Sequence, residues 1–277
     1  MTQPSSVSPS GRRAKVPFVK AHGTGNDFLF TPATDAPREK LPAFARAICA
    51  RHTGVGADGW YLVSPDAECD AAIHLYNSDG SEAELSGNGT RCAAAMLTDE
   101  GRAGELVRIR TGAGIRELRL LERLGREFVF EMRMGQPTVR DEDLHRRLPL
   151  PGGEAEVTIL DVGNPQCAVF VDAFPESWLR TAADLEGHPH FPNRTNVSFV
   201  RVVDRHRIEA RFYERGAGET LSSGTGSMGA AVAAIVRGVA ESPVRVQTAA
   251  GGLDLRWDGD VYLKGPAVIV ARGEWLP

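Results

Sequence analysis

Two stretches of the chain carry one pattern: IHLYNSDGSEAELSGNGTRCAAA at Ile73–Ala95 and ARFYERGAGETLSSGTGSMGAAV at Ala210–Val232. They align without a gap at an offset of 137 residues, and seven of the 23 pairs are identical. A second pair of motifs, Gly25-Asn26 and Gly163-Asn164, lies at an offset of 138 residues. Because two separate motifs recur at nearly one spacing, the sequence predicts two similarly folded halves of about 140 residues that face each other.

The local patterns are those of short strands with few helices. Thirteen β-leaning runs lie between Phe28–Phe30 and Val261–Leu263. The run SMGAAVAAIV that follows Gly226 is apolar nearly all round, which predicts a helix buried inside its own sheet. We expect an α+β fold of two pseudo-symmetric domains, each a mainly antiparallel sheet wrapped around a central helix. Helices are expected at Leu41–Arg51, Gly89–Leu97, Pro175–Ala183 and Gly226–Arg237.

The repeat also indicates how the chain is divided. Residues 1–15 are rich in Ser and Pro and then basic, with no apolar segment behind them. This composition predicts a disordered tail rather than a secretory signal. We expect an N-terminal half at 16–136 and a C-terminal half at 137–264, with residues 265–277 returning to the N-terminal half.

Composition excludes several classes of function. A net charge of −4 and a pI near 6.0 give no general electrostatic reason to bind nucleic acid or an anionic membrane. The four cysteines show no C-x-x-C spacing, so we expect reduced thiols in a cytoplasm and no metal site. Four of the 32 basic residues are lysines, which leaves few candidates for a Schiff base. The scarcity of lysine therefore favours chemistry that needs no pyridoxal phosphate.

The repeated segments Ser86–Thr90 (SGNGT) and Ser223–Ser227 (SGTGS) each open one of the expected central helices. Glycines let a backbone approach a ligand closely, and the free N–H groups of a helix start bind anions. Each segment taken alone is better interpreted as a glycine-rich turn with a serine N-cap. Their duplication favours a carboxylate held between two helix starts, with a serine on each side.

Other polar residues stand in motif-like settings. An isolated asparagine usually serves a turn, and a charged pair at a strand end is usually solvated. The segment Gly224–Gly229 also fits the dinucleotide fingerprint, but the preceding strand ends near Tyr213, too early for that fold, and we reject it. The candidates for ligand contact are Asn26, Asn77, Asn164, Asn196 and the pair Glu214-Arg215.

With these residues in place, the chain resembles the diaminopimelate epimerase family from Val19 to its C-terminus. The matching segments occur in the family's order. The resemblance implies a two-domain fold, a small amino-acid substrate in the cleft, and interconversion of L,L- and meso-diaminopimelate for lysine and peptidoglycan precursor synthesis, without cofactor. The segments are HGTGNDF (His22–Phe28), RHTGVGADG (Arg51–Gly59), NSDGSEAELSGNGTRC (Asn77–Cys92), VGNPQC (Val162–Cys167), RTNV (Arg194–Val197), YERGAGETLSSGTGS (Tyr213–Ser227) and GPAV (Gly265–Val268).

The family has two catalytic cysteines, which exchange a proton with opposite faces of Cα. Their positions are occupied in this chain by Ser86 and Ser223. A serine hydroxyl is a weak base unless a neighbouring group activates it, and Glu214 is the one matched ionisable partner. Gln166 stands where the family has a histidine beside one cysteine. The substrate contacts that the resemblance implies are Asn26, Asn77, Gly87, Asn88, Asn164, Asn196, Glu214, Arg215, Gly224 and Thr225.

Two further departures concern Gly59, where the family has a glutamine, and Ala271, where it has a tyrosine near its dimer interface. A homodimer stays compatible with the sequence. Three functions remain open: an epimerase of diaminopimelate or a similar amino acid, an isomerase of a more acidic carboxylate substrate on the same scaffold, and a ligand-binding homologue with lost or very weak activity.

Overall fold

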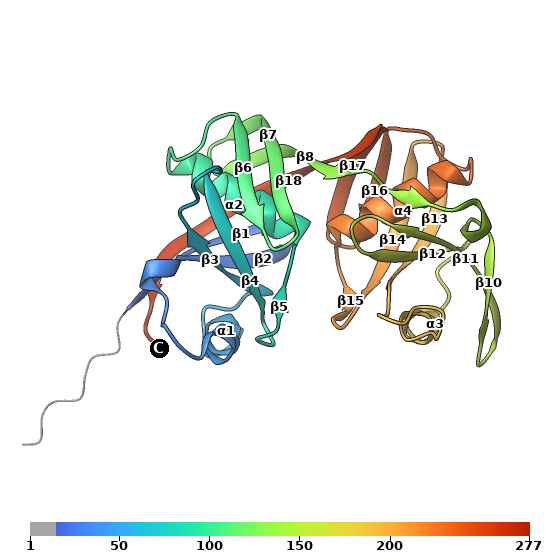
Figure 1. Ribbon diagram of the computed structural model, residues 1–277, viewed down its shortest axis with the longest axis horizontal. Helices are drawn as coiled ribbons and strands as arrows, with labels where there is room; N and C mark the ends of the chain where they lie inside the picture. Colours follow the sequence, from blue (N-terminus) through green and yellow to red (C-terminus); the bar gives the residue numbers. More distant parts are fainter. Residues whose placement is uncertain (1–14) are drawn as a thin grey trace, which may run out of the picture.

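The computed structural model describes residues 15–277 as two lobes set side by side (Figure 1). The tail predicted at 1–15 lies outside the described residues, except for its last member, Lys15. No helix within the described residues is both long and apolar enough to cross a bilayer.

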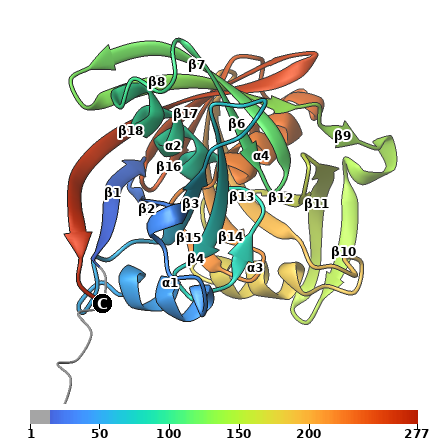
Figure 2. The same ribbon diagram turned by 60° about the vertical axis from the view of Figure 1, so that its left-hand side comes forward.

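The N-terminal lobe encloses one helix, α2, within its strands (Figures 1 and 2). A second helix, α1, lies outside the sheet at the lower edge of the lobe in Figure 1. The elements are β1 (Val16–Gly23), β2 (Asn26–Pro32), the 3-10 turn η1 (Ala33–Asp35), α1 (Leu41–Cys49), β3 (Gly59–Ser64), β4 (Ala71–Asn77), β5 (Glu82–Ala83), α2 (Gly87–Asp99), β6 (Leu106–Thr111), β7 (Gly114–Leu124) and β8 (Glu127–Gly135).

The C-terminal lobe has the same plan, with α4 enclosed and α3 outside (Figure 1). Its elements are β9 (Thr138–Val139), the 3-10 turn η2 (Asp141–Asp143), β10 (Arg146–Leu150), β11 (Gly153–Asp161), β12 (Pro165–Phe170), α3 (Trp178–Glu186), β13 (Asn196–Asp204), β14 (Arg207–Glu214), β15 (Gly218–Thr220), α4 (Gly224–Val236), β16 (Val244–Thr248), β17 (Gly251–Asp258) and β18 (Asp260–Trp275).

Strand pairing repeats between the lobes. In the first, β2 pairs parallel with β3 and β4 parallel with β6. In the second, β12 pairs parallel with β13 and β14 parallel with β16. The other pairings are antiparallel, including β3–β4 and its counterpart β13–β14. The recurrence of the same pairing order confirms the predicted pair of similar, mainly antiparallel halves.

The last strand, β18, joins the two lobes (Figure 1). Its first residues pair with β17, in the register Leu255↔Leu263. Over residues 261–268 it also pairs with β8, and from Val268 onward it pairs with β1, in the register Val19↔Arg272. The chain therefore returns from the second lobe to the first through one continuous strand. The division at 136/137 and 264/265 stays a prediction.

Each central helix has 13 residues and begins directly after a serine. Ser86 accepts a hydrogen bond from the backbone N–H of Gly89 at 3.2 Å, and Ser223 accepts one from Gly226 at 3.0 Å. Small residues let both helices fit inside their sheets, and α2 and α4 share one continuous hydrophobic core. Serine is a favoured N-cap residue, so the two serines occupy equivalent places in the fold.

Several element boundaries differ from those expected from the sequence. Both central helices begin two residues earlier than predicted, because the serine cap places the following glycine in the first helical turn. The outer helix α1 ends at Cys49 instead of Arg51, and α3 begins at Trp178 instead of Pro175. Six strand segments were not predicted: β1, the short strands β5, β9 and β15, β10, and the second part of β18. Pro17 and Pro266 interrupt the strand signal, although both segments pair in the sheet.

Candidate active site

The starts of the two central helices meet at the boundary between the lobes. A methyl group built on Gly87 would lie 3.5 Å from Cα of Gly224, and one built on Gly224 would lie 3.4 Å from Cα of Gly87. Thr24 and Ser222 link the lobes beside this contact through hydroxyl oxygens 3.0 Å apart. Because each helix start carries free N–H groups and a partial positive charge, their convergence favours an anion between the lobes.

On the C-terminal side, Ser223 is joined to a carboxylate. Its Oγ donates a hydrogen bond to Oε1 of Glu214 at 2.5 Å and accepts one from Gly226. Burial raises the pKa of Glu214 above its ordinary value, and the hydrogen bond from Ser223 opposes this shift. A carboxylate with a raised pKa is a stronger base than an exposed one once it is ionised. Ser223 thus has the neighbouring base that a serine requires.

The raised pKa of Glu214 predicts a pH-dependent effect on stability. A carboxyl whose pKa is higher in the folded chain contributes stability below its unfolded pKa, and that contribution is lost as the pH rises through the folded pKa. Glu214→Gln removes the ionisation. We therefore expect a higher Tm than that of the unmodified chain at neutral pH and an equal Tm under acidic conditions, by scanning calorimetry. Glu219→Gln, at an exposed position on β15, is the control. Equal Tm values for both chains at every pH would contradict the placement of Glu214 in a buried site.

On the N-terminal side, Ser86 has a different environment. Its Oγ accepts the hydrogen bond from Gly89, and within residues 15–277 no hydrogen bond joins it to a carboxylate. The hydroxyl of Tyr61 on β3 lies against the same turn, 2.2 Å from a methyl group built on Gly89; burial raises the pKa of Tyr61, and Ser86 lowers it. The two serines therefore occupy equivalent positions but have unlike neighbours.

Asn26 and Asn88 belong to one hydrogen-bonded chain. Nη2 of Arg91 donates to Oδ1 of Asn88 at 2.5 Å, and Nδ2 of Asn88 donates to Oδ1 of Asn26 at 3.3 Å. Nδ2 of Asn26 then donates to Oδ2 of Asp58 at 2.7 Å. This chain runs from a buried cation to a carboxylate, so it fixes the orientation of both amides beside the helix start.

Arg91 is a charged residue in the middle of a buried helix. Its side chain is fully buried, and its hydrogen-bond acceptors are Asn88 and the backbone carbonyls of Gly87 and Pro266. Burial lowers the pKa of Arg91 to about 10, which leaves it protonated at neutral pH. No carboxylate pairs with it within the described part of the chain. Its charge adds to the positive potential of the α2 start.

The predicted residues Asn164, Gln166 and Thr225 also lie together. Nε2 of Gln166 donates to Oδ1 of Asn164 at 2.7 Å, and Nδ2 of Asn164 lies 3.5 Å from Oγ1 of Thr225. Gln166 is fully buried and packs against Gly229 of α4. The amide of Gln166 therefore orients Asn164 at the start of α4 and supplies no base.

Two other predicted residues are already engaged by the fold. Oδ1 of Asn196 accepts from the backbone N–H of Arg215 at 3.0 Å, and its Nδ2 donates to the carbonyl of Pro165 at 3.1 Å. Asn196 thus holds the turn that carries Arg215, whose own side chain is exposed. Asn77 donates to Ser81 at 3.0 Å, and within residues 15–277 no hydrogen bond joins it to Ser86 or Ser223. The roles of all these residues in turnover stay predictions.

Sequence reasoning missed Tyr61 and Arg91. Arg91 carried a usable signal, because a charged residue within an otherwise buried helix is rare unless it serves the site. Tyr61 carried none, since an aromatic residue in an apolar strand is ordinary core composition. Tyr61 lies against the first turn of α2 only because the sheet closes around that helix.

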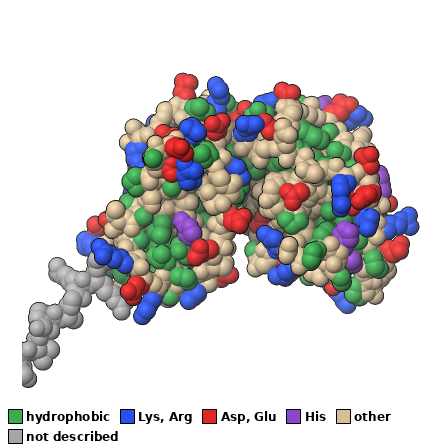
Figure 3. Space-filling view, in the orientation of Figure 1, with side chains coloured by type: hydrophobic (Ala, Val, Ile, Leu, Met, Phe, Trp, Pro, Cys, Tyr) green, Lys and Arg blue, Asp and Glu red, His purple; other side chains and the backbone are tan. Residues whose placement is uncertain are grey.

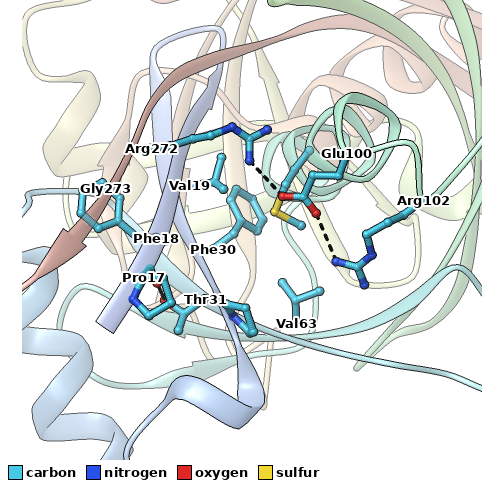
Figure 4. A pocket seen from close by; sticks show the side chains of 12 residues that line it. Pro17, Phe18, Val19, Phe30, Thr31, Val63, Glu100, Arg102, Arg272 and Gly273 are labelled. Atoms are coloured by element: carbon cyan, nitrogen blue, oxygen red, sulfur yellow. Dashed lines mark hydrogen bonds and ion pairs between the residues drawn. The ribbon is translucent and has the colours of Figure 1, made fainter. Parts of the chain in front are cut away.

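Two hollows lie away from the serines. The first, of about 270 Å³, is lined by apolar side chains such as Phe18 and Phe30, with Arg272 and Arg102 paired to Glu100 at its rim (Figure 4). The second, of about 430 Å³, adjoins the turn at Thr24. The space-filling view shows both signs of charge interspersed over the lobes and a furrow between them (Figure 3). Neither hollow contains a predicted catalytic residue.

The starts of α2 and α4 face each other, and each presents free N–H groups that can bind an anion and a serine hydroxyl. This geometry is expected of an isomerase that removes a proton from one face of a carbon and returns it to the other. The fold is similar to that of a hydroxyproline epimerase from Agrobacterium vitis, with a TM-score of 0.74 at 15% identity, covering 95% of this chain and 92% of that one.

The chain belongs to the diaminopimelate epimerase family, whose model matches residues 18–139 and 158–270. It is 39% identical over 278 residues to the diaminopimelate epimerase of Moorella thermoacetica, covering 93% of this chain and 98% of that protein. It is 36% identical over 274 residues to that of Acetivibrio thermocellus, covering 93% and 97%. These matches confirm the family that the sequence motifs indicated.

Proposed function

We propose that this chain is a cofactor-independent epimerase of the diaminopimelate epimerase type, which interconverts L,L- and meso-diaminopimelate in the cytoplasm for lysine and peptidoglycan precursor synthesis. Family membership supports the substrate class. The observation that carries the proposal is the meeting of two serine-capped helix starts at Gly87 and Gly224, with a carboxylate bonded to one of the serines.

The first step is the binding of the substrate carboxylate. We place it against the backbone N–H groups of Gly87-Asn88 and Gly224-Thr225, where the positive ends of both helix dipoles converge. The guanidinium of Arg91 strengthens that potential from inside the lobe. A carboxylate held there brings Cα between Ser86 and Ser223, because each serine immediately precedes one of the two helix starts.

The second step is proton transfer at Cα. On one face, Oγ of Ser223 takes the α-proton as its own proton passes to Glu214. On the other face, the hydroxyl of Ser86 supplies a proton. Two groups are needed because the proton leaves one face and returns to the opposite one. Hydroxyls are far weaker acids than thiols, so this pair should work more slowly than a pair of cysteines.

The test is direct conversion of one stereoisomer. Purified chain is incubated with L,L-diaminopimelate, and the meso isomer is followed by chiral chromatography, with binding measured in parallel by isothermal titration calorimetry. We expect saturable binding and slow appearance of the meso form. Binding without any conversion over days would favour a ligand-binding homologue. Absence of binding at millimolar concentration would contradict an amino-acid ligand altogether.

The assembly is a separate proposal. The family resemblance implies a homodimer, and Ala271 stands where the family has a tyrosine near that interface. Analytical ultracentrifugation of the purified chain is expected to show a dimer, and a monomer at micromolar concentration would contradict this expectation.

A further inference from the structure

The hydroxyl of Tyr61 is an isolated polar group in an apolar region. The side chain is 2% exposed, and its ring packs between Phe28 and Phe30, with ring centroids 5.4 and 5.1 Å away. Within residues 15–277 its oxygen forms no hydrogen bond of regular geometry. A buried hydroxyl without a partner destabilises a fold, so a phenylalanine would pack better here.

That oxygen lies against the first turn of α2. A methyl group built on Gly89 would lie 2.2 Å from it, and the N–H of the same Gly89 donates to Oγ of Ser86. The polar groups that act on the pKa of the phenol are Cys92, whose charge raises it, and the side chain and backbone of Ser86, which lower it. Burial, the larger influence, raises the pKa of Tyr61 far above its ordinary value, so the phenol keeps its proton at neutral pH.

The two faces of the site therefore differ in chemical character. Ser223 is hydrogen-bonded to the carboxylate of Glu214, which accepts a proton. Ser86 caps the helix turn against which the phenol of Tyr61 lies, and this buried phenol keeps its proton and has no hydrogen-bond partner within the described residues. The duplicated fold supplies two equivalent serines, and unlike neighbours give the serines unlike roles.

We propose, building on the proposed function, that Tyr61 is the positioning partner of Ser86 and makes the N-terminal face of the site a proton donor, as Glu214 makes the C-terminal face a proton acceptor. Tyr61 acts through the hydroxyl of Ser86 and does not itself touch the substrate.

The proton inventory balances. The Cα–H bond breaks toward Ser223, whose hydroxyl proton passes to Glu214. A new Cα–H bond forms on the opposite face with the hydroxyl proton of Ser86, and the phenol proton of Tyr61 moves to the oxygen of Ser86. The products are a neutral Glu214 and a phenolate at Tyr61. Because burial disfavours that phenolate, return of the proton to the original face should be faster than inversion.

The contact between Tyr61 and residue 86 can be tested without turnover. Ser86→Cys places a thiol at the helix start, and its ionisation is followed by the pH dependence of alkylation. Cys69→Ser removes the one partly exposed native thiol, while burial raises the pKa of Cys49 and Cys92 to about 12 and also raises that of Cys167. Adding Tyr61→Phe should raise the pKa of the introduced thiol by about one unit, which is a tenfold smaller thiolate fraction below both pKa values.

The matched control places the thiol on the opposite face of the site, at residue 223. In a chain carrying Ser223→Cys and Cys69→Ser, Tyr61→Phe should leave the pKa of the introduced thiol unchanged, because that thiol adjoins Glu214. An equal pKa at residue 86 with and without Tyr61→Phe would overturn the proposal. An equal shift at both residues would do the same, since it would indicate a general effect on the fold.

The Tm of the Tyr61→Phe variant distinguishes a purely structural role of Tyr61 from a role in proton transfer. Tyr61→Phe keeps the ring and removes an unpaired hydroxyl, so the Tm should stay equal or rise, while the ratio of meso product to α-proton exchange in D2O falls severalfold. Tyr262→Phe, on β18 beneath Arg256, should change neither quantity. A lowered Tm with an unchanged ratio would overturn the role of Tyr61. Failure of the proposed function is distinguishable, because it would abolish conversion while leaving the thiol titration unaffected.

Discussion

Replacing Ser86 and Ser223 together by cysteine should raise the rate of L,L- to meso-diaminopimelate conversion by about 10²–10⁴-fold over the unmodified chain. Proton abstraction needs a base that is populated near neutral pH. A thiol at a helix start meets that condition, because the helix dipole lowers its pKa from about 8.5. Initial rates of meso formation under saturating substrate measure the effect.

Each single replacement should recover little of this gain. Residues that act as a unit are strongly non-additive, and one thiol cannot both remove a proton from one face and return it on the other. Ser177→Cys is the matched control, because Ser177 directly precedes α3 but is exposed and makes no side-chain cap. Gln166 and Gly59 also differ from the family pattern, so full family activity is not expected. A single replacement as active as the double one would contradict the two-base account.

Glu214→Gln in the unmodified chain should lower conversion by about 10²–10⁴-fold, the usual contribution of one acid–base group. Glutamine keeps the size of the side chain and its hydrogen bond to Ser223 but cannot accept a proton at neutral pH. Activity of the unmodified chain should rise with pH through the raised pKa of Glu214, because the ionised form is the base. The rate is measured by meso formation across a pH series.

Glu219→Gln again serves as the control, since Glu219 lies nearby on β15 with an exposed side chain. It should change neither the rate nor the pH profile. Glu214→Gln with a normal rate and an unchanged pH profile would show that some other group activates Ser223.

Much of this architecture could be predicted from the sequence. The duplicated segments that contain Ser86 and Ser223 are local and periodic, so they indicated two equal halves, two central helices and two facing serines. Glu214 was matched to a catalytic serine through the family resemblance, and the structure joins it directly to Ser223. Local patterns of this kind are preserved on folding because neighbouring residues remain neighbours.

The remainder depends on contacts between distant parts of the chain. Tyr61 meets the start of α2 only when β3 curves around the helix, and no local pattern marks its hydroxyl. Arg91 reaches the carbonyl of Pro266 across 175 residues. The strand β18 contains Pro266, which weakens its local strand signal, yet pairing on both sides keeps it in the sheet. Tertiary pairing overrides local preference at these sites.

Proton NMR of L,L-diaminopimelate in D2O with the unmodified chain tests the central claim most directly, because loss of the α-proton signal reports proton transfer itself. The account predicts that this signal disappears more slowly than once per second per site, while the side-chain methylene signals persist. An intact α-proton signal in a sample where calorimetry shows saturated binding would contradict proton transfer at Ser86 and Ser223. Exchange at ordinary enzyme rates, of order 1–10³ per second, would contradict the argument from hydroxyl acidity.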